Sequence, residues 1–131
     1  MSKENVEIVR SFIDTLNRGE LDAGLSVTSP DFELDFSRSD GPYRGVYTRD
    51  QMKRLLVDFG ETFESVRTEA DEFIDLGERV VVPHTHYFQG RDGIEAHARN
   101  TWLVALRDGA IVLIRLYRER QEALEAAGLR E

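Results

Sequence analysis

Apolar side chains recur at helical spacing near the start of the chain. Residues 3–17 carry one apolar stripe, formed by Val6, Val9, Ile13 and Leu16 with Ile8 and Phe12 beside it. This period of 3.6 residues predicts an amphipathic helix that packs one face on a core. Gly19 marks its end, because glycine readily adopts the left-handed conformation that closes a helix. A shorter helix is expected over residues 21–27, before Pro30.

A third helix has a recognisable start at Thr48. Thr48 and Gln51 have the spacing of a capping box, in which each side chain accepts a hydrogen bond from a free backbone N–H group. An apolar helix face then continues through Met52, Leu55, Leu56, Phe59 and Phe63. Residues 37–47, which precede it, contain two Gly and one Pro and are expected to form a loop.

The remaining segments alternate between apolar and polar residues, which predicts β-strands. They cover residues 32–36, 64–76, 79–89, 94–106 and 110–118, with an irregularity expected at Phe73 and Ile74. Two Asp-Gly turns, at Asp92-Gly93 and Asp108-Gly109, join the last three strands, and this dipeptide is a strong hairpin signal. A polar helix over residues 119–127 follows, with Leu124 as its one large apolar residue.

Helices and strands are segregated along the chain, which favours an α+β fold with an antiparallel sheet. We expect one domain spanning residues 1–131, an α+β cone in which a curved antiparallel sheet wraps around the N-terminal helices. Such a sheet leaves a conical hollow between itself and the helices.

The hairpin predicts which side chains line that hollow. Pairing Val82 with Trp102 places His84 opposite Asn100 and His86 opposite Ala98, all on the inner face. The last strand is expected to turn Val112, Ile114 and Leu116 inward, and Arg115 and Tyr117 outward.

Composition and charge exclude several classes of function. The net charge of −8 argues against nucleic acid or an anionic membrane as a partner. The chain has no cysteine, so disulfides, thiolate catalysis and cysteine-ligated metal centres are excluded. Neither a signal peptide nor an apolar run of membrane-spanning length is visible, and we expect a cytoplasmic protein.

Several segments resemble the SnoaL-like group of the nuclear-transport-factor-2-like superfamily, which also holds ketosteroid isomerases and limonene epoxide hydrolase. They are residues 4–10 (ENVEIVR), 17–22 (NRGELD), 42–45 (PYRG), 75–82 (DLGERVVV), 106–109 (LRDG) and 117–129 (YRERQEALEAAGL). The resemblance implies the conical fold and a pocket for a small hydrophobic or aromatic molecule. It also implies a homodimer, because members of this superfamily commonly dimerise through the outer face of the sheet. That face would here carry Val81, Leu113 and Tyr117, with Arg99 and Arg115 beside them. The resemblance implies no single activity, because this scaffold carries isomerases, cyclases, hydrolases and binding modules.

The resemblance also suggests where catalytic groups would stand. Ketosteroid isomerases use a tyrosine on the first helix, where this chain has Phe12, and a protonated aspartic acid on the strand that here carries Asn100 to Trp102. Their base lies near Asp35. Only the base, one of these three catalytic groups, therefore has a counterpart in this chain, which argues against steroid isomerisation. The acidic and basic residues of the epoxide hydrolase are not recognisable.

His84 and His86 are the most informative polar residues of the inner face. They lie two apart on one strand, so their side chains emerge on the same face about 7 Å apart. Histidine titrates near neutral pH and suits general acid–base chemistry. The alternatives are that one or both are core histidines with satisfied hydrogen bonds, or that they line a dimer surface. A His-x-His pair is also common in metal sites, but no carboxylate follows and His97 falls on the other face, so we expect no metal.

The function predicted from these residues is a pocket for a small organic molecule, with cofactor-free acid–base chemistry of isomerase, cyclase or hydratase type. Asp35 and His84 would move protons, and Asp35 would have a raised pKa against an apolar wall. Substrate would contact the side chains of His86, Asn100, Trp102, Tyr43 and Phe12. The alternative is a non-catalytic module that binds a ligand or forms a dimer scaffold.

Overall fold

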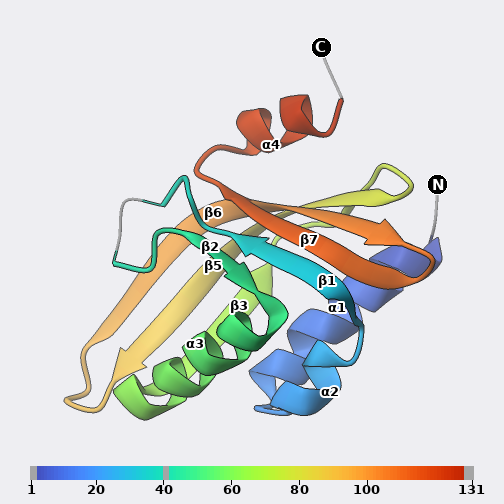
Figure 1. The fold of residues 1–131 in the computed structure, drawn as a ribbon. Helices are drawn as coiled ribbons and strands as arrows, with labels where there is room; N and C mark the ends of the chain where they lie inside the picture. The colour runs from blue at the N-terminus through green and yellow to red at the C-terminus, as the bar shows by residue number, and fades with distance from the viewer. Residues whose placement is uncertain (1–2, 40–41, 129–131) are drawn as a thin grey trace.

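The computed structural model describes residues 3–39 and 42–128 as one curved sheet that encloses three helices, with a fourth helix outside (Figure 1). In chain order the elements are α1 (Lys3–Asn17), α2 (Leu21–Leu25), β1 (Thr28–Asp35), β2 (Val46–Thr48), α3 (Arg49–Thr62), β3 (Phe63–Ala70), β4 (Ile74–Asp75), β5 (Arg79–Gly90), β6 (Glu95–Arg107), β7 (Ala110–Tyr117) and α4 (Arg120–Ala126). The expected α+β cone is confirmed.

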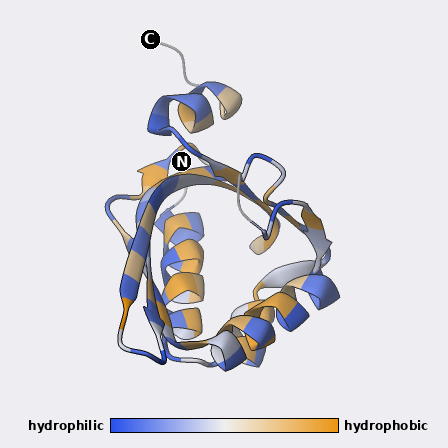
Figure 2. Ribbon diagram, turned by 90° about the vertical axis from the view of Figure 1, so that its left-hand side faces the viewer, coloured by the Kyte–Doolittle hydropathy of each residue, from blue (hydrophilic) through white to orange (hydrophobic). Residues whose placement is uncertain are grey.

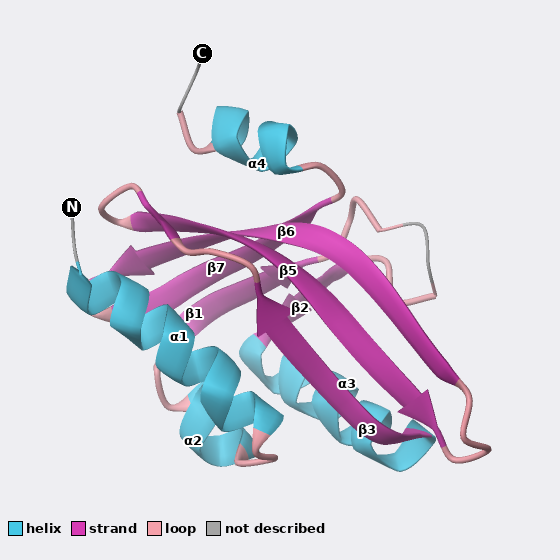
Figure 3. Ribbon diagram, turned by 180° about the vertical axis from the view of Figure 1, so that it is seen from behind, coloured by secondary structure: helices cyan, strands magenta, loops and turns pink. Residues whose placement is uncertain are grey.

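The sheet has the strand order β2-β1-β7-β6-β5-β3, and β4 adds to β5. All neighbours are antiparallel except β1 and β7. The sheet curves over α1 and α3, while α4 lies on its opposite side (Figure 2). Seen from behind, α1 and α3 lie on the same side of the sheet, with α2 beside α1 (Figure 3). None of the helices in the described part of the chain is long and apolar enough to cross a membrane.

The two Asp-Gly turns fix the register of the long strands. Gly93 and Gly109 have φ of 87° and 79°, and Asp108 also has a positive φ of 52°. The β5–β6 pairing is confirmed as predicted: Val82 lies opposite Trp102, His84 opposite Asn100 and His86 opposite Ala98. These turns thereby place both histidines on the concave face.

The last strand differs from its prediction at one end. The β6–β7 register shifts between Ala105 and Leu106, so Leu106 pairs with Ile111. Ile111 therefore joins Ile114 and Leu116 in the core, in place of Val112. The inward placement of Ile114 and Leu116 is confirmed.

The main core lies between the concave face of the sheet and the helices. Helix α1 contributes Val9, Phe12 and Ile13, helix α2 contributes Leu25, helix α3 contributes Met52 and Leu55, and the strands contribute the rest. The predicted capping box is present: Thr48 Oγ1 accepts from the Gln51 backbone N–H group at 3.2 Å, and Gln51 Oε1 accepts from the Thr48 N–H group at 2.9 Å. This cap sets the start of α3.

A second, smaller core covers part of the convex face. Val81, Leu103 and Tyr117 pack there against Ala123, Leu124 and Ala127 of the C-terminal segment. The short α4 is therefore held by buried apolar area rather than by helix propensity alone. Two members of the predicted dimer patch, Val81 and Tyr117, are 0% and 5% exposed because α4 lies over them. The homodimer itself stays a prediction.

Candidate functional site

A cavity of about 800 Å³ opens between the concave face of the sheet and helices α1 and α3. Two lining residues, Phe12 and Trp102, are only 1% and 6% exposed and belong to the core beneath it. Of the described lining residues, only Arg18 and Glu64 carry charge, and both are exposed. The cavity therefore offers an apolar interior with neutral polar groups.

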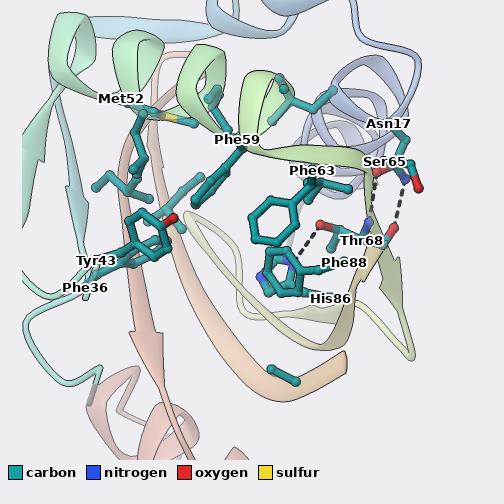
Figure 4. A pocket seen from close by; sticks show the side chains of 18 of the residues that line it. Asn17, Phe36, Tyr43, Met52, Phe59, Phe63, Ser65, Thr68, His86 and Phe88 are labelled. Atoms are coloured by element: carbon teal, nitrogen blue, oxygen red, sulfur yellow. Dashed lines mark hydrogen bonds between the residues drawn. The ribbon is translucent and has the colours of Figure 1, made fainter. Parts of the chain in front are cut away.

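Aromatic rings form much of one side of this cavity (Figure 4). The Tyr43 ring packs edge-on against Phe59 with 4.7 Å between centroids, and Phe63 lies 5.2 Å from Phe88. These rings come from the loop before β2, from α3, and from β3 and β5. Such edges and faces favour a flat, apolar ligand.

His86 and Thr68 face each other across neighbouring strands. Asn17, the last residue of α1, binds Thr68 twice: Asn17 Nδ2 donates to the Thr68 carbonyl at 2.8 Å, and Asn17 Oδ1 accepts from the Thr68 N–H group at 2.9 Å. Both Thr68 backbone groups thus point away from β5, so Thr68 and His86 form a non-hydrogen-bonded pair with close side chains. This explains the distance of 2.8 Å between Thr68 Oγ1 and His86 Nδ1 (Figure 4).

His84 lies behind His86 and away from the cavity. Its side chain is 1% exposed and is absent from the cavity lining. His84 Nε2 lies 3.1 Å from His86 Nε2, and His84 Nδ1 lies 2.9 Å from the Val82 carbonyl oxygen. Only His86 of the pair can therefore contact a ligand in the cavity.

Both histidines are neutral at pH 7 in this environment. Burial lowers the pKa of His84 to about 4, although the Val82 carbonyl and Asp71 partly oppose the shift. Burial and the neighbouring His84 also lower the pKa of His86. His86 therefore faces the cavity as a neutral hydrogen-bonding group, with the neutral His84 behind it.

Asp35 lies outside the cavity, which corrects the expectation of a base at its mouth. Its neighbours Leu34 and Phe36 line the cavity, so the alternation of β1 turns Asp35 to the convex face. There Asp35 Oδ2 accepts from Arg115 Nε at 2.8 Å, and Oδ1 accepts from the Ser37 N–H group and hydroxyl at 2.9 and 2.6 Å. Burial raises its pKa, but the Ser37 and Arg115 hydrogen bonds outweigh burial, and the net pKa is lowered rather than raised.

Asn100 and Trp102 line the cavity on β6, as expected. The half-buried side-chain amide of Asn100 has no partner within the described part of the chain. The indole ring of Trp102 lies 4.4 Å from the His84 ring, and Trp102 Nε1 is the one fully buried side-chain polar atom without a partner among residues 3–39 and 42–128. Asn100 can therefore both donate to a ligand and accept from it.

The structure thus places five of the seven expected site residues around one cavity: Phe12, Tyr43, His86, Asn100 and Trp102. His84 stands behind them, and Asp35 is on the other face. Within the described ranges, no group of three or more His, Asp or Glu residues is placed to hold a metal ion.

Asn17 and Thr68 were missed by sequence reasoning, although a signal for Thr68 existed. Thr68 belongs to the alternating run of β3, and the pairing of that run with β5 places it opposite His86. Asn17 carried no comparable signal, because its role depends on where α1 ends relative to β3.

These features define a protein of the nuclear-transport-factor-2-like fold. Comparison with protein families matches residues 9–114 to the SnoaL-like domain. The chain belongs to this SnoaL-like family. No curated protein matches the chain.

Solved structures of the same fold cover nearly the whole chain. A nuclear-transport-factor-2-like protein of unknown function from Burkholderia pseudomallei is 23% identical, with a TM-score of 0.76 over 95% of this chain and 97% of that one. TerC, co-crystallized with polyporic acid, is 20% identical, with a TM-score of 0.76 over 96% and 99%. A putative polyketide cyclase from Xanthomonas campestris is 20% identical, with a TM-score of 0.69 over 95% and 97%. At these identities the likeness concerns the fold alone.

Proposed function

We propose that this protein binds a neutral, largely aromatic small molecule in the cavity between the sheet and helices α1 and α3. The observation that carries the proposal is the cavity of about 800 Å³, which stays open although Phe12 and Trp102 pack beneath it. Ligand pockets of this size are mostly apolar, with a few placed polar groups. A pure dimer scaffold has no need of such a volume.

The described residues of the cavity interior carry no charge, which supports a neutral ligand. Arg18 and Glu64 lie at the exposed rim, and Arg18 pairs with Glu20 at 3.1 Å. A charged ligand group would lose its hydration inside the cavity without an opposite charge to replace it. The aromatic side chains on α3, β3 and β5 give a flat ring favourable contacts.

Binding is better supported than acid–base catalysis. A general base for work near pH 7 needs a pKa close to that value. Burial holds the pKa of His84 at about 4 and also lowers that of His86, while Asp35 lies on the other face. The fold neighbours support a small-molecule role only by analogy: one is named a putative polyketide cyclase and another was co-crystallized with polyporic acid.

A blocking variant tests the proposal. Ala98 lines the cavity opposite His86, whereas His97, the adjacent residue of β6, lies exposed outside the cavity lining. Ala98→Phe should abolish binding of 2-naphthol, followed by chemical-shift changes of the protein, and His97→Phe should leave binding unchanged. Absence of binding to the wild-type protein, or equal binding to both variants, would overturn the proposed pocket.

A further inference from the structure

Four residues connect helix α1 to the interior of the sheet through successive hydrogen bonds. Asn17 holds the backbone of Thr68, Thr68 Oγ1 contacts His86 Nδ1, His86 Nε2 contacts His84 Nε2, and His84 Nδ1 contacts the Val82 carbonyl. The distances from Thr68 onward are 2.8, 3.1 and 2.9 Å. Each is short enough for a hydrogen bond.

The direction of this chain follows from its inner end. A carbonyl oxygen only accepts, so His84 Nδ1 must carry the proton that it donates to Val82. His84 is neutral, so its Nε2 has a lone pair and accepts. His86 Nε2 must then carry a proton and donate it to His84.

The same reasoning extends to the cavity. A neutral His86 with its proton on Nε2 has a lone pair on Nδ1, which therefore accepts the Thr68 hydroxyl proton. The Thr68 oxygen has then used its only proton and keeps lone pairs. Thr68 is half-buried and lines the cavity, so these lone pairs are placed where a ligand can reach them.

Asn17 holds the Thr68 backbone in place within this arrangement. Two hydrogen bonds fix the Thr68 backbone at an edge strand that would otherwise have free N–H and C=O groups. The backbone position from which the Thr68 side chain reaches His86 is therefore set by α1 as well as by the sheet. Asn17 is a positioning residue in this arrangement.

We infer that Asn17, Thr68, His86 and His84 form a hydrogen-bond chain of one fixed direction, which presents the Thr68 hydroxyl oxygen to the cavity as an acceptor and selects ligands that carry a hydrogen-bond donor. The inference rests on the proposed function and narrows the ligand to an aromatic compound with a donor group, such as an aromatic hydroxyl. An ether of the same shape cannot donate to Thr68, so the lone pairs of the Thr68 hydroxyl oxygen accept no hydrogen bond from it.

The chain can be tested without any ligand. Nitrogen-15 NMR of the free protein at pH 7 distinguishes the two neutral forms of each histidine ring. We expect the proton on Nδ1 in His84 and on Nε2 in His86. The opposite form at either ring would overturn the inference whether or not the cavity binds anything.

A pair of probes tests the selection. We expect 2-naphthol to bind the wild-type protein about three- to tenfold more tightly than 2-methoxynaphthalene, the range that one hydrogen bond supplies. Thr68→Val keeps the side-chain shape without the hydroxyl group and should remove this preference, whereas Thr68→Ser should retain it. Equal affinity of both probes for the wild-type protein, or a preference that survives in Thr68→Val, would overturn the inference and leave the pocket intact. Failure of both probes to bind would instead overturn the proposed function and the ligand selection with it.

Discussion

His84 is a titratable side chain held in an almost fully enclosed position. Its ring packs against Trp102 and His86, with centroids 4.4 and 4.5 Å away, and its Nδ1 lies within hydrogen-bond distance of the Val82 carbonyl oxygen. Such a residue stabilises the fold only while it stays neutral, because protonation would place a charge in an apolar interior. This has a direct consequence for stability at acid pH.

We predict that the free energy of unfolding falls as the pH drops from about 6.5 to about 4. The pKa of His84 is lowered from 6.5 to about 4 in the folded protein, so the unfolded chain binds a proton that the folded one excludes in this window. The expected slope is about 1.4 kcal/mol per pH unit for each buried histidine. Urea denaturation across this window, on the wild type and on His97→Gln as an exposed control, measures it. A flat profile would contradict the buried neutral histidines.

Asp35 is predicted to serve stability and not the chemistry of the cavity. Asp35→Asn weakens hydrogen bonds with Arg115 and Ser37 and should cost about 1–3 kcal/mol of unfolding free energy, while probe affinity stays unchanged. Asp31→Asn is the matched control, because its ion pair with Arg107 is exposed to water and its loss should cost less stability than Asp35→Asn. Loss of probe binding in Asp35→Asn would assign Asp35 to the site after all.

At the scale of elements, the end of α1 holds the edge of the sheet. We predict that Asn17→Ala loses about 1 kcal/mol of stability, because two hydrogen bonds at an exposed position are replaced by water. Amide exchange of Thr68 should speed up in this variant, while exchange of the buried Val104 in the interior strand β6, which does not pair with β3, should not change. Unaltered exchange at Thr68 would mean that Asn17 does not hold the strand.

The long elements could be predicted from the sequence because local chemistry sets them. The alternation of β5 and the Asp-Gly turn determine that His84 faces Asn100, and the capping box determines where α3 begins. The same alternation places Leu34 and Phe36 inward and therefore Asp35 outward. The expectation for Asp35 followed a family resemblance against this local signal, and the local signal was correct.

Other features depended on contacts between distant segments. The short strand β2 fell within a predicted loop, and β1 begins four residues before its predicted start because it pairs with β7 on both sides of an irregularity around Pro30. Helix α4 looks polar in the sequence, yet Ala123 and Leu124 are buried because Val81 and Leu103 supply an apolar surface for them. The residues of α4 alone do not reveal that this helix will pack on the convex face of the sheet.

At the scale of the whole molecule, the sheet is covered on both faces by parts of the same chain. We predict that Leu124→Asp detaches α4, because a buried leucine becomes a charge without a partner, at a cost of at least about 2 kcal/mol. The uncovered Val81, Leu103 and Tyr117 should then promote self-association beyond that of the wild type, which light scattering after size-exclusion chromatography measures. Glu125→Lys changes an exposed position of the same helix and should have neither effect; an unaltered Leu124→Asp protein would contradict the role of α4.

The two hydrogen bonds between Asn17 and Thr68 also affect how the protein behaves at high concentration. Strand β3 ends the sheet, and a terminal strand can template the addition of a strand from another molecule. Asn17 occupies the N–H and C=O groups of Thr68 that an incoming strand would need, and Arg67 and Glu69 place charges on either side. Asn17, which positions Thr68 beside the cavity, thereby also protects the molecule against edge-to-edge aggregation.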